Sequence, residues 1–147
     1  MKSKLIYQQA GERTFALVFE IDDDPIAGLS EFARSQNLAA SHFTGIGAFR
    51  EATLAYFDWD RKEFVEIPIR EQVEVLTLAG DIALEEGRPK VHAHVVVGKR
   101  DGSAHGGHLK AARVRPTLEV VLVESPAHLR RRMDPTTGLA LIDLSAT

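Results

Sequence analysis

Four of the six histidines in the chain form two neighbouring pairs, His92 with His94 and His105 with His108. Alternate residues of a β-strand point to the same face, so His92 and His94 are expected to lie side by side. Two imidazoles at that spacing can share one metal ion at Zn–N distances of about 2.0–2.1 Å. Residues 99–102 have the composition of a turn, which would return a later histidine to this strand from a loop. The pattern predicts a three-histidine metal site.

The third ligand stays open at this point, because the spacing does not rank His105 against His108. The two glycines between them would let the backbone approach closely and adopt positive φ. Paired histidines on a solvent-facing strand also occur without a metal, so ordinary surface histidines are the competing interpretation. His42 and His128 stand apart in the sequence and are interpreted as surface or packing residues.

The residue types at this site indicate zinc. The chain has no cysteine, which excludes disulfides, thiolate nucleophiles and cysteine-ligated zinc or iron–sulfur centres. Nickel, copper and iron also bind imidazole and remain alternatives. Three protein ligands would leave a fourth position for water or a ligand oxygen, as in catalytic zinc sites.

Length and charge narrow the class of protein. The chain has 147 residues, 44% of them hydrophobic, which fits a single domain over residues 1–147. Its formal charge of -3 argues against a general attraction to nucleic acid or anionic lipid. No apolar run approaches the roughly 20 residues of a membrane-spanning helix, and the first residues lack the apolar core of a signal peptide. We therefore expect a cytoplasmic protein without a membrane partner.

The elements that must position the histidines are mostly strands. Strands are predicted at residues 15–21, 64–67, 73–78, 91–97 and 117–123, with two more inside 38–57 that separate near Gly45 and Gly47. One helix is predicted, with Asp24 as N-cap, Pro25 at its first position and Asn37 as its stop. Short turns favour an antiparallel sheet with the helix covering one face, which is an α+β fold.

Several segments in order resemble the plants-and-prokaryotes-conserved (PPC) domain family over nearly the whole chain. They include Thr-Gly-Ile-Gly-Ala-Phe at residues 44–49, Val-His-Ala-His at 91–94 and Asp-Gly-Ser-Ala-His-Gly-Gly-His-Leu at 101–109. The resemblance implies a compact α+β subunit that assembles as a homotrimer. Plant members join this domain to AT-hook segments, and stand-alone bacterial members often carry a DNA-binding label without a known activity.

The histidine pattern is also similar to that of acetolactate decarboxylase, a related fold that holds zinc with three histidines. This resemblance implies that His92, His94 and His108 are the ligands. It leaves His105 as a neighbour or a residue at the rim of the site.

Glu119 is a candidate for a role beyond the ligands. It shares one face of the predicted strand 117–123 with Thr117, Val121 and Val123, where a carboxylate is costly unless it is paired. Three interpretations stay open: a hydrogen bond to a ligating imidazole, a surface or intersubunit ion pair, and a catalytic acid or base.

Three other motifs are given structural interpretations. Gly45-x-Gly47 lacks the third glycine of a dinucleotide-binding loop and is interpreted as a strand bend or as tight packing between subunits. Residues 87–90 share the Gly-Arg-Pro core of an AT-hook, but Glu85 and Glu86 precede them, so a turn between strands is expected. The basic run 130–132 is interpreted as making salt bridges or lining an anion-binding cleft.

Three functions follow as hypotheses. The first is a trimeric PPC-domain protein whose zinc-type site binds a small anionic ligand. The second is a metal-dependent lyase or decarboxylase that acts on an oxo acid, with the metal polarising a carbonyl. The third is a DNA-associated regulator, which the acidic charge balance disfavours.

Overall fold

The computed structural model describes residues 1–145, which form nine strands and one helix. In chain order the elements are β1 (Lys2–Gln9), β2 (Glu12–Phe19), α1 (Pro25–Gln36), β3 (Ala40–Asp58), β4 (Glu63–Ile69), β5 (Val73–Glu85), β6 (Arg88–Gly98), β7 (Ala104–Glu124), β8 (Arg130–Asp134) and β9 (Leu139–Ile142).

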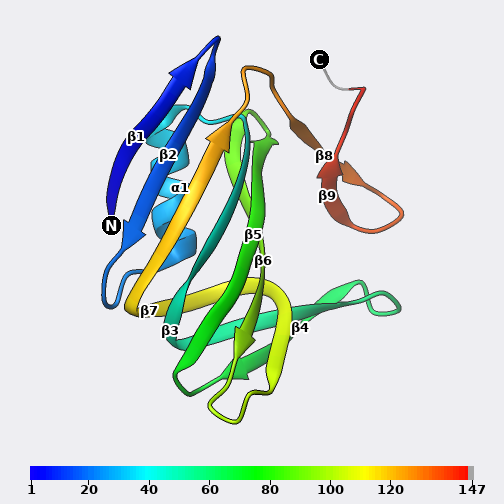
Figure 1. The fold of residues 1–147 in the computed structure, drawn as a ribbon. Coiled ribbons are helices and arrows are strands. Elements are labelled where there is room, and N and C mark those ends of the chain that lie inside the picture. The colour runs from blue at the N-terminus through cyan, green and yellow to red at the C-terminus, as the bar shows by residue number, and fades with distance from the viewer. Residues whose placement is uncertain (146–147) are drawn as a thin grey trace.

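The strands belong to one sheet with the order β1-β2-β7-β3-β5-β8-β9, in which β4 pairs with β3 and β6 pairs with both β5 and β7. Every pairing is antiparallel except that of β5 with β8. Strand β7 bends near its middle, so that one half continues the sheet beside β2 while the other half turns toward β6 (Figure 1). The predicted α+β fold with a mostly antiparallel sheet is confirmed.

Helix α1 forms as the sequence predicts and covers one face of the sheet (Figure 1). The Asp24 side chain accepts a hydrogen bond from the Ala27 N–H at 3.0 Å, and Asn37 ends the helix in the left-handed conformation. The buried side chains Leu29 and Phe32 turn toward the core. Within residues 1–145 no helix is long and apolar enough to cross a membrane.

The two strands predicted inside residues 38–57 are in fact one long strand, β3, so this prediction was wrong in detail. The ladder between β3 and β5 shifts register between Gly45 and Gly47 but does not end there. A Cβ atom at Gly47 would lie only 2.2 Å from the Thr117 carbonyl oxygen of β7. Glycine is therefore needed at this position because two backbones of the same chain pass close together.

Three strands, β1, β8 and β9, have no counterpart among the predicted elements. Strand β7 also begins at Ala104, whereas the sequence predicted a strand only over 117–123. The extra length places His108 on a strand, because the first half of β7 carries this residue.

Candidate metal centre

The β6–β7 hairpin brings the histidines together. Its turn is closed by hydrogen bonds from the Lys99 N–H to the Ser103 carbonyl (2.8 Å) and from the Gly102 N–H to the Lys99 carbonyl (2.9 Å). The register that follows places His94 directly opposite His108. The third histidine is thus on a strand, which corrects the expectation that a loop supplies it.

His92, His94 and His108 form a compact triad. Each offers one ring nitrogen, and these atoms all lie within 4.8 Å of one another. The ring centroids are 5.1 Å apart for His92 and His94, 5.3 Å for His92 and His108, and 5.4 Å for His94 and His108. The triad is the grouping that the resemblance implied.

The remaining histidines lie outside the triad. His105 pairs with Val97, three residues nearer the turn, and its nitrogens are not part of the cluster among the described residues. His42 and His128 are exposed. The register of the hairpin thus ranks His108 above His105.

The two glycines beside His108 were expected to allow a close backbone approach and a positive φ, and only the close approach is found. A Cβ atom at Gly107 would lie 2.8 Å from the Ala55 carbonyl oxygen of β3, so the predicted close approach is confirmed. Neither Gly106 nor Gly107 has positive φ among the described residues, so that part of the expectation was wrong. Both glycines are in extended strand backbone, because His108 is reached along β7 and not through a loop.

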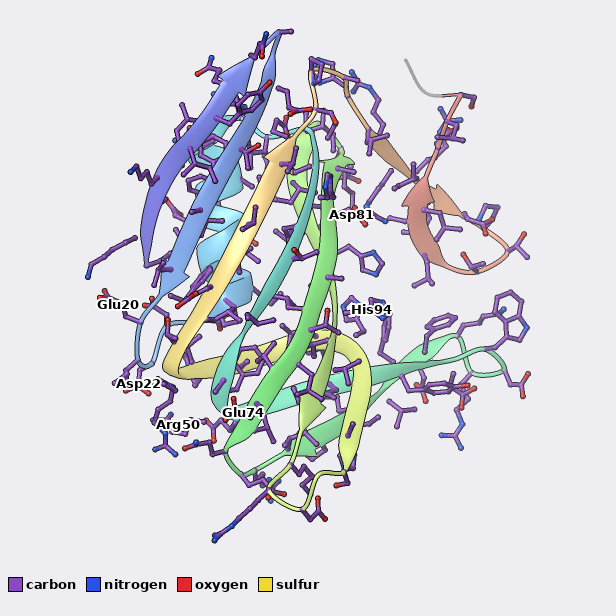
Figure 2. The ribbon with its side chains drawn as sticks, in the orientation of Figure 1. Glu20, Asp22, Arg50, Glu74, Asp81 and His94 are labelled. Atoms are coloured by element: carbon purple, nitrogen blue, oxygen red, sulfur yellow. The ribbon has the colours of Figure 1, made fainter. Side chains whose placement is uncertain are left out.

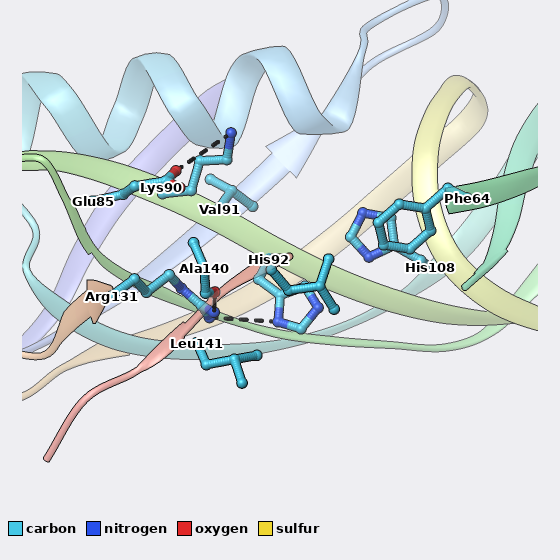
Figure 3. Close-up of a pocket in the computed structure, with 10 residues that line it drawn as sticks. Phe64, Glu85, Lys90, Val91, His92, His108, Arg131, Ala140 and Leu141 are labelled. Carbon is cyan, nitrogen blue, oxygen red and sulfur yellow. Dashed lines mark hydrogen bonds and ion pairs between the residues drawn. The ribbon is translucent and has the colours of Figure 1, made fainter. Parts of the chain in front are cut away.

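His108 is held against an aromatic side chain and keeps one nitrogen without a partner. Its ring centroid lies 5.0 Å from that of Phe64, which projects from β4 (Figure 3). The Nδ1 atom is buried and makes no hydrogen bond within the described part of the chain. Burial, together with the nearby charges of His92 and His94, lowers the pKa of His108 to about 4.

His94, like His108, favours the neutral imidazole at neutral pH. Burial and the adjacent His92 also lower the pKa of His94 below its ordinary value. A metal ion binds imidazole only in its neutral form. Three clustered histidine rings, one of which keeps a buried nitrogen without a hydrogen-bond partner in the described part of the chain, fit a zinc-type cation.

Two charged residues lie beside His92: Asp81, which the sequence did not single out (Figure 2), and Arg131, which belongs to the basic run 130–132. Asp81 of β5 is the register partner of His92, and its Oδ2 lies 3.4 Å from His92 Nδ1. Arg131 of β8 donates from Nη2 to Asp81 Oδ1 at 2.5 Å and places the same nitrogen 3.4 Å from His92 Nδ1. The shorter distance assigns the Arg131 proton to Asp81, so Asp81 Oδ2 is free to accept the His92 Nδ1 proton.

This arrangement fixes the orientation of His92. Burial raises the pKa of Asp81, but its hydrogen bonds with His92 and Arg131 outweigh that effect and leave the pKa below the ordinary value. Asp81 is therefore a carboxylate at neutral pH. Metal-ligating histidines commonly donate their second ring N–H to a carboxylate, which leaves Nε2 for the metal.

A cavity of about 310 Å³ opens beside the triad (Figure 3). Half of its lining residues are apolar and half are polar or charged. The lining residues are Phe64, Glu85, Lys90, Val91, His92, His108, Arg131, Leu139, Ala140 and Leu141. The volume is at the lower end of the range for small-molecule sites.

Glu119 lies elsewhere on β7. It is exposed, opposite Val18 of β2 and Ile46 of β3, in the half of β7 that does not pair with β6. It is neither in the histidine cluster nor among the described residues that line the cavity. The structure therefore brings the three histidines together and does not bring Glu119 to them.

The remaining motifs form a hairpin turn and a group of ion-paired arginines. The tip of the β5–β6 hairpin lies at Glu86 and Gly87, which confirms the turn at the AT-hook-like segment. Arg132 contacts Asp143 at 3.2 Å, and Arg131 makes the Asp81 ion pair, as the salt-bridge interpretation expected. Arg131 also lines the cavity beside the triad.

Similarity to known proteins agrees with this fold. Residues 7–126 match the family model of the Plants and Prokaryotes Conserved (PCC) domain. A structure of the metal-containing protein from Archaeoglobus fulgidus is 33% identical, with a TM-score of 0.82 over 97% of this chain and 99% of that one. A protein from Ralstonia eutropha JMP134, described as a "putative DNA-binding protein", is 31% identical, with a TM-score of 0.82 over 88% and 90% of the two chains.

Two further similarities are partial. A Staphylococcus aureus protein of unknown function, described as similar to alpha-acetolactate decarboxylase, shares 16% identity and a TM-score of 0.52 over 74% of this chain and 50% of that one, which shows a related fold alone. The bifunctional protein GlmU of Synechococcus sp. is 32% identical over 113 residues, which are 75% of this chain. This chain spans only 17% of the length of that curated relative.

The family match extends from β1 to the end of β7 and includes all three histidines of the triad. The chain therefore belongs to the Plants and Prokaryotes Conserved domain family.

Proposed function

We propose that this protein binds zinc through His92, His94 and His108 and that the metal site takes up a small anionic ligand. The observation that carries the proposal is the cluster of three ring nitrogens within 4.8 Å, beside a cavity of about 310 Å³. Three protein nitrogens leave one tetrahedral position for a ligand oxygen. Nickel, copper or iron would use the same donors, and zinc is the choice that three neutral imidazoles without thiolate favour.

Support for a metal comes from the chemistry of the donors. His108 keeps a buried Nδ1 without a partner, and a pKa of about 4 leaves its ring neutral. Asp81 holds His92 in one orientation. The similar protein from Archaeoglobus fulgidus is itself described as metal-containing.

Support for a small anionic ligand comes from the cavity. Bound zinc would supply positive charge and Lewis acidity to an oxygen of the ligand. Lys90 adds a flexible cation at the cavity wall, where it is 3.7 Å from Glu85. Phe64 and Val91 exclude water from one side and suit an apolar part of the ligand.

We further propose that the protein acts as a homotrimer, as its family resemblance implies. Val18 and Ile46 flank Glu119 in one row across β2, β7 and β3, and all three side chains are exposed, Ile46 to 64%. Val121 lies two residues further along the same face of β7 and is also exposed. Exposed apolar rows of this kind mark association surfaces. Light scattering should give three times the chain mass, and Ile46→Asp should reduce it.

The assembly also decides what Glu119 can do. Within one protomer Glu119 lies inside the proposed contact surface, between Val18 and Ile46, so an ion pair between subunits is the role that its position favours. A catalytic role would require a neighbouring protomer to bring Glu119 to a metal site.

Decarboxylation or another lyase reaction is the second candidate function, since the S. aureus protein that resembles alpha-acetolactate decarboxylase shares the fold. Such a reaction needs an acid or base beside the metal. Glu85 is the carboxylate among the described residues that line the cavity. Turnover of oxo acids that is abolished by a chelator and reduced by Glu85→Gln would support this function.

DNA association is less well supported by the described residues. The Ralstonia eutropha protein carries a DNA-binding description. In this chain, however, Arg131 and Arg132 contact Asp81 and Asp143, so their charge is partly neutralised within the protein. A salt-dependent shift of random duplex DNA would favour this third hypothesis.

Metal content by mass spectrometry tests the first proposal, on untagged protein that has never been exposed to a chelating resin. We expect about one zinc per chain, lost in His92→Ala and in His108→Ala. His42→Ala and His128→Ala are matched controls, because both side chains are exposed and outside the triad. Absence of metal in every form, even after zinc is added, would overturn the proposal.

A further inference from the structure

One wall of the cavity comes from the C-terminal hairpin formed by β8 and β9 (Figure 3). Arg131, Leu139, Ala140 and Leu141 belong to this hairpin, whereas the histidines belong to β6 and β7. The hairpin follows the residues 7–126 that match the family model. The cavity is therefore completed by a segment that the family match does not include.

Few backbone contacts hold the hairpin to the sheet. Its parallel ladder with β5 consists of Leu84 opposite Arg130 and Glu85 opposite Arg131. The Leu84 N–H adds a hydrogen bond to the Leu129 carbonyl at 2.7 Å. These contacts fix β8 at the end of β5, next to Asp81.

Arg131 ties this hairpin to the metal centre. Its side chain is only 8% exposed, donates from Nη2 to Asp81 and donates from Nη1 to the Ala140 carbonyl at 3.0 Å. One guanidinium thus joins β9 to the carboxylate behind His92. Because Nη1 and Nη2 both donate hydrogen bonds within the protein, Arg131 connects β9 to Asp81 and is poorly placed to bind a ligand anion.

The surface that the hairpin offers to the cavity is instead apolar. Leu139 and Leu141 alternate along β9 and both line the cavity. Phe64 and Val91 add apolar surface from β4 and β6. A ligand that fills the cavity would have its polar end at the histidines and an apolar end against β9.

We propose that the β8–β9 hairpin is the specificity wall of the metal site and selects a small aliphatic carboxylic acid with an oxygen next to its carboxylate, such as a 2-oxo acid. This inference rests on the proposed function. The carboxylate and the adjacent oxygen suit a zinc-type cation, and the aliphatic tail contacts Leu139 and Leu141. Each methylene buried there should raise the affinity about three- to fourfold.

Isothermal titration calorimetry of the zinc-loaded protein tests the inference, with pyruvate, 2-oxobutanoate, 2-oxopentanoate and 4-methyl-2-oxopentanoate as probes. The dissociation constant should fall along this series in the wild-type protein. Leu141→Ser and, separately, Leu139→Ser should bind pyruvate as before and lose most of the dependence on tail length. Ile142→Ser is the matched control, because Ile142 adjoins Leu141 on β9, is exposed and is not among the described residues that line the cavity.

Zinc stoichiometry is measured first on each protein, which separates the two proposals. Wild-type protein that binds no zinc refutes the proposed function. Zinc-loaded protein that binds none of the acids, or binds all four equally, overturns the specificity wall alone. The specificity wall is likewise overturned if Leu141→Ser and Leu139→Ser keep the wild-type dependence on tail length. The two substitutions are independent, so one that unfolds leaves the other to decide.

Discussion

Asp81 lies directly opposite His92 in the ladder between β5 and β6, with its Oδ2 3.4 Å from His92 Nδ1. The carboxylate is itself held by Arg131 at 2.5 Å. One histidine of the triad is thus backed by a carboxylate and an arginine that come from two other strands. This chain of contacts links the histidine triad to the wall of the adjacent cavity.

Removing the charge of Asp81 should weaken metal binding without removing a ligand. In Asp81→Asn we expect zinc affinity to fall about 10- to 100-fold, because His92 loses the carboxylate that orients it. Competition with a chromophoric chelator measures the change. Asp60→Asn is the control, since Asp60 is exposed at the β3–β4 hairpin tip. Equal zinc affinity in Asp81→Asn and wild type would show that the carboxylate does not support the site.

The metal-free protein should lose stability as the pH falls from about 6.5 to about 4. The pKa of His108 is about 4 in the folded state, against 6.5 for an ordinary histidine, so the unfolded chain binds the proton first. The free energy of unfolding should therefore be level above pH 6.5, fall through this interval and level off below it as far as His108 is concerned. Urea denaturation at a series of pH values measures the curve.

The control for this pH dependence is His108→Asn, which removes one titrating ring and should reduce the fall, leaving the part that His94 contributes because its pKa is also lowered. Asp81 acts mainly at the acid end of this interval and below it, because its pKa is lowered from the ordinary carboxyl value. An identical decline in His108→Asn and wild type would assign the effect to other groups.

The three histidines of the triad could be predicted from the sequence, because the position of each turn sets the strand register. Once residues 99–103 are taken as the turn, counting outward along both strands pairs His94 with His108 and leaves His105 opposite Val97. Counting outward from the turn at Glu86 and Gly87 likewise pairs Asp81 with His92. Side-chain alternation without register finds the histidines of β6 and misses Asp81, because Asp81 is on a different strand.

The C-terminal hairpin could not be predicted in the same way. Strand β8 is Arg-Arg-Arg-Met-Asp and has no apolar alternation, because it is stabilised by ion pairs such as Arg131 with Asp81. Strand β1 is exposed along its whole length and also lacks an apolar face. Periodicity detects helices and strands that bury one face. Helix α1 and strand β2 each do so, and both were predicted.

Glu124 should prove important for stability and unimportant for the metal. This buried carboxylate accepts hydrogen bonds from the Ala39 N–H at 2.8 Å, the Ala40 N–H at 3.3 Å and the Ser41 hydroxyl. Glu124→Ala would leave these donors without a partner and should cost about 3 kcal/mol of unfolding free energy. Urea denaturation measures the loss, and zinc stoichiometry should not change. Glu20→Ala, which breaks an exposed pair with Lys2, should cost much less.

Gly80 of β5 tests whether the metal site depends on the backbone beneath it. A Cβ atom there would lie 2.3 Å from the His92 carbonyl oxygen and 2.4 Å from Cζ of the buried Phe43. Gly80→Ala must therefore push β6 away from β5, which displaces His92 relative to Asp81. We expect a loss of about 1–3 kcal/mol in stability together with weaker zinc binding.

Gly87→Ala separates these two effects. Gly87 has φ of 77° in the turn of the same hairpin and open space around its Cβ position, so alanine strains the turn by about 1–2 kcal/mol without touching the site. Both variants should thus be destabilised, while only Gly80→Ala should lose zinc affinity. If both lose zinc affinity in proportion to their stability, the site follows global stability. If neither loses it, the spacing of β5 and β6 does not control the triad.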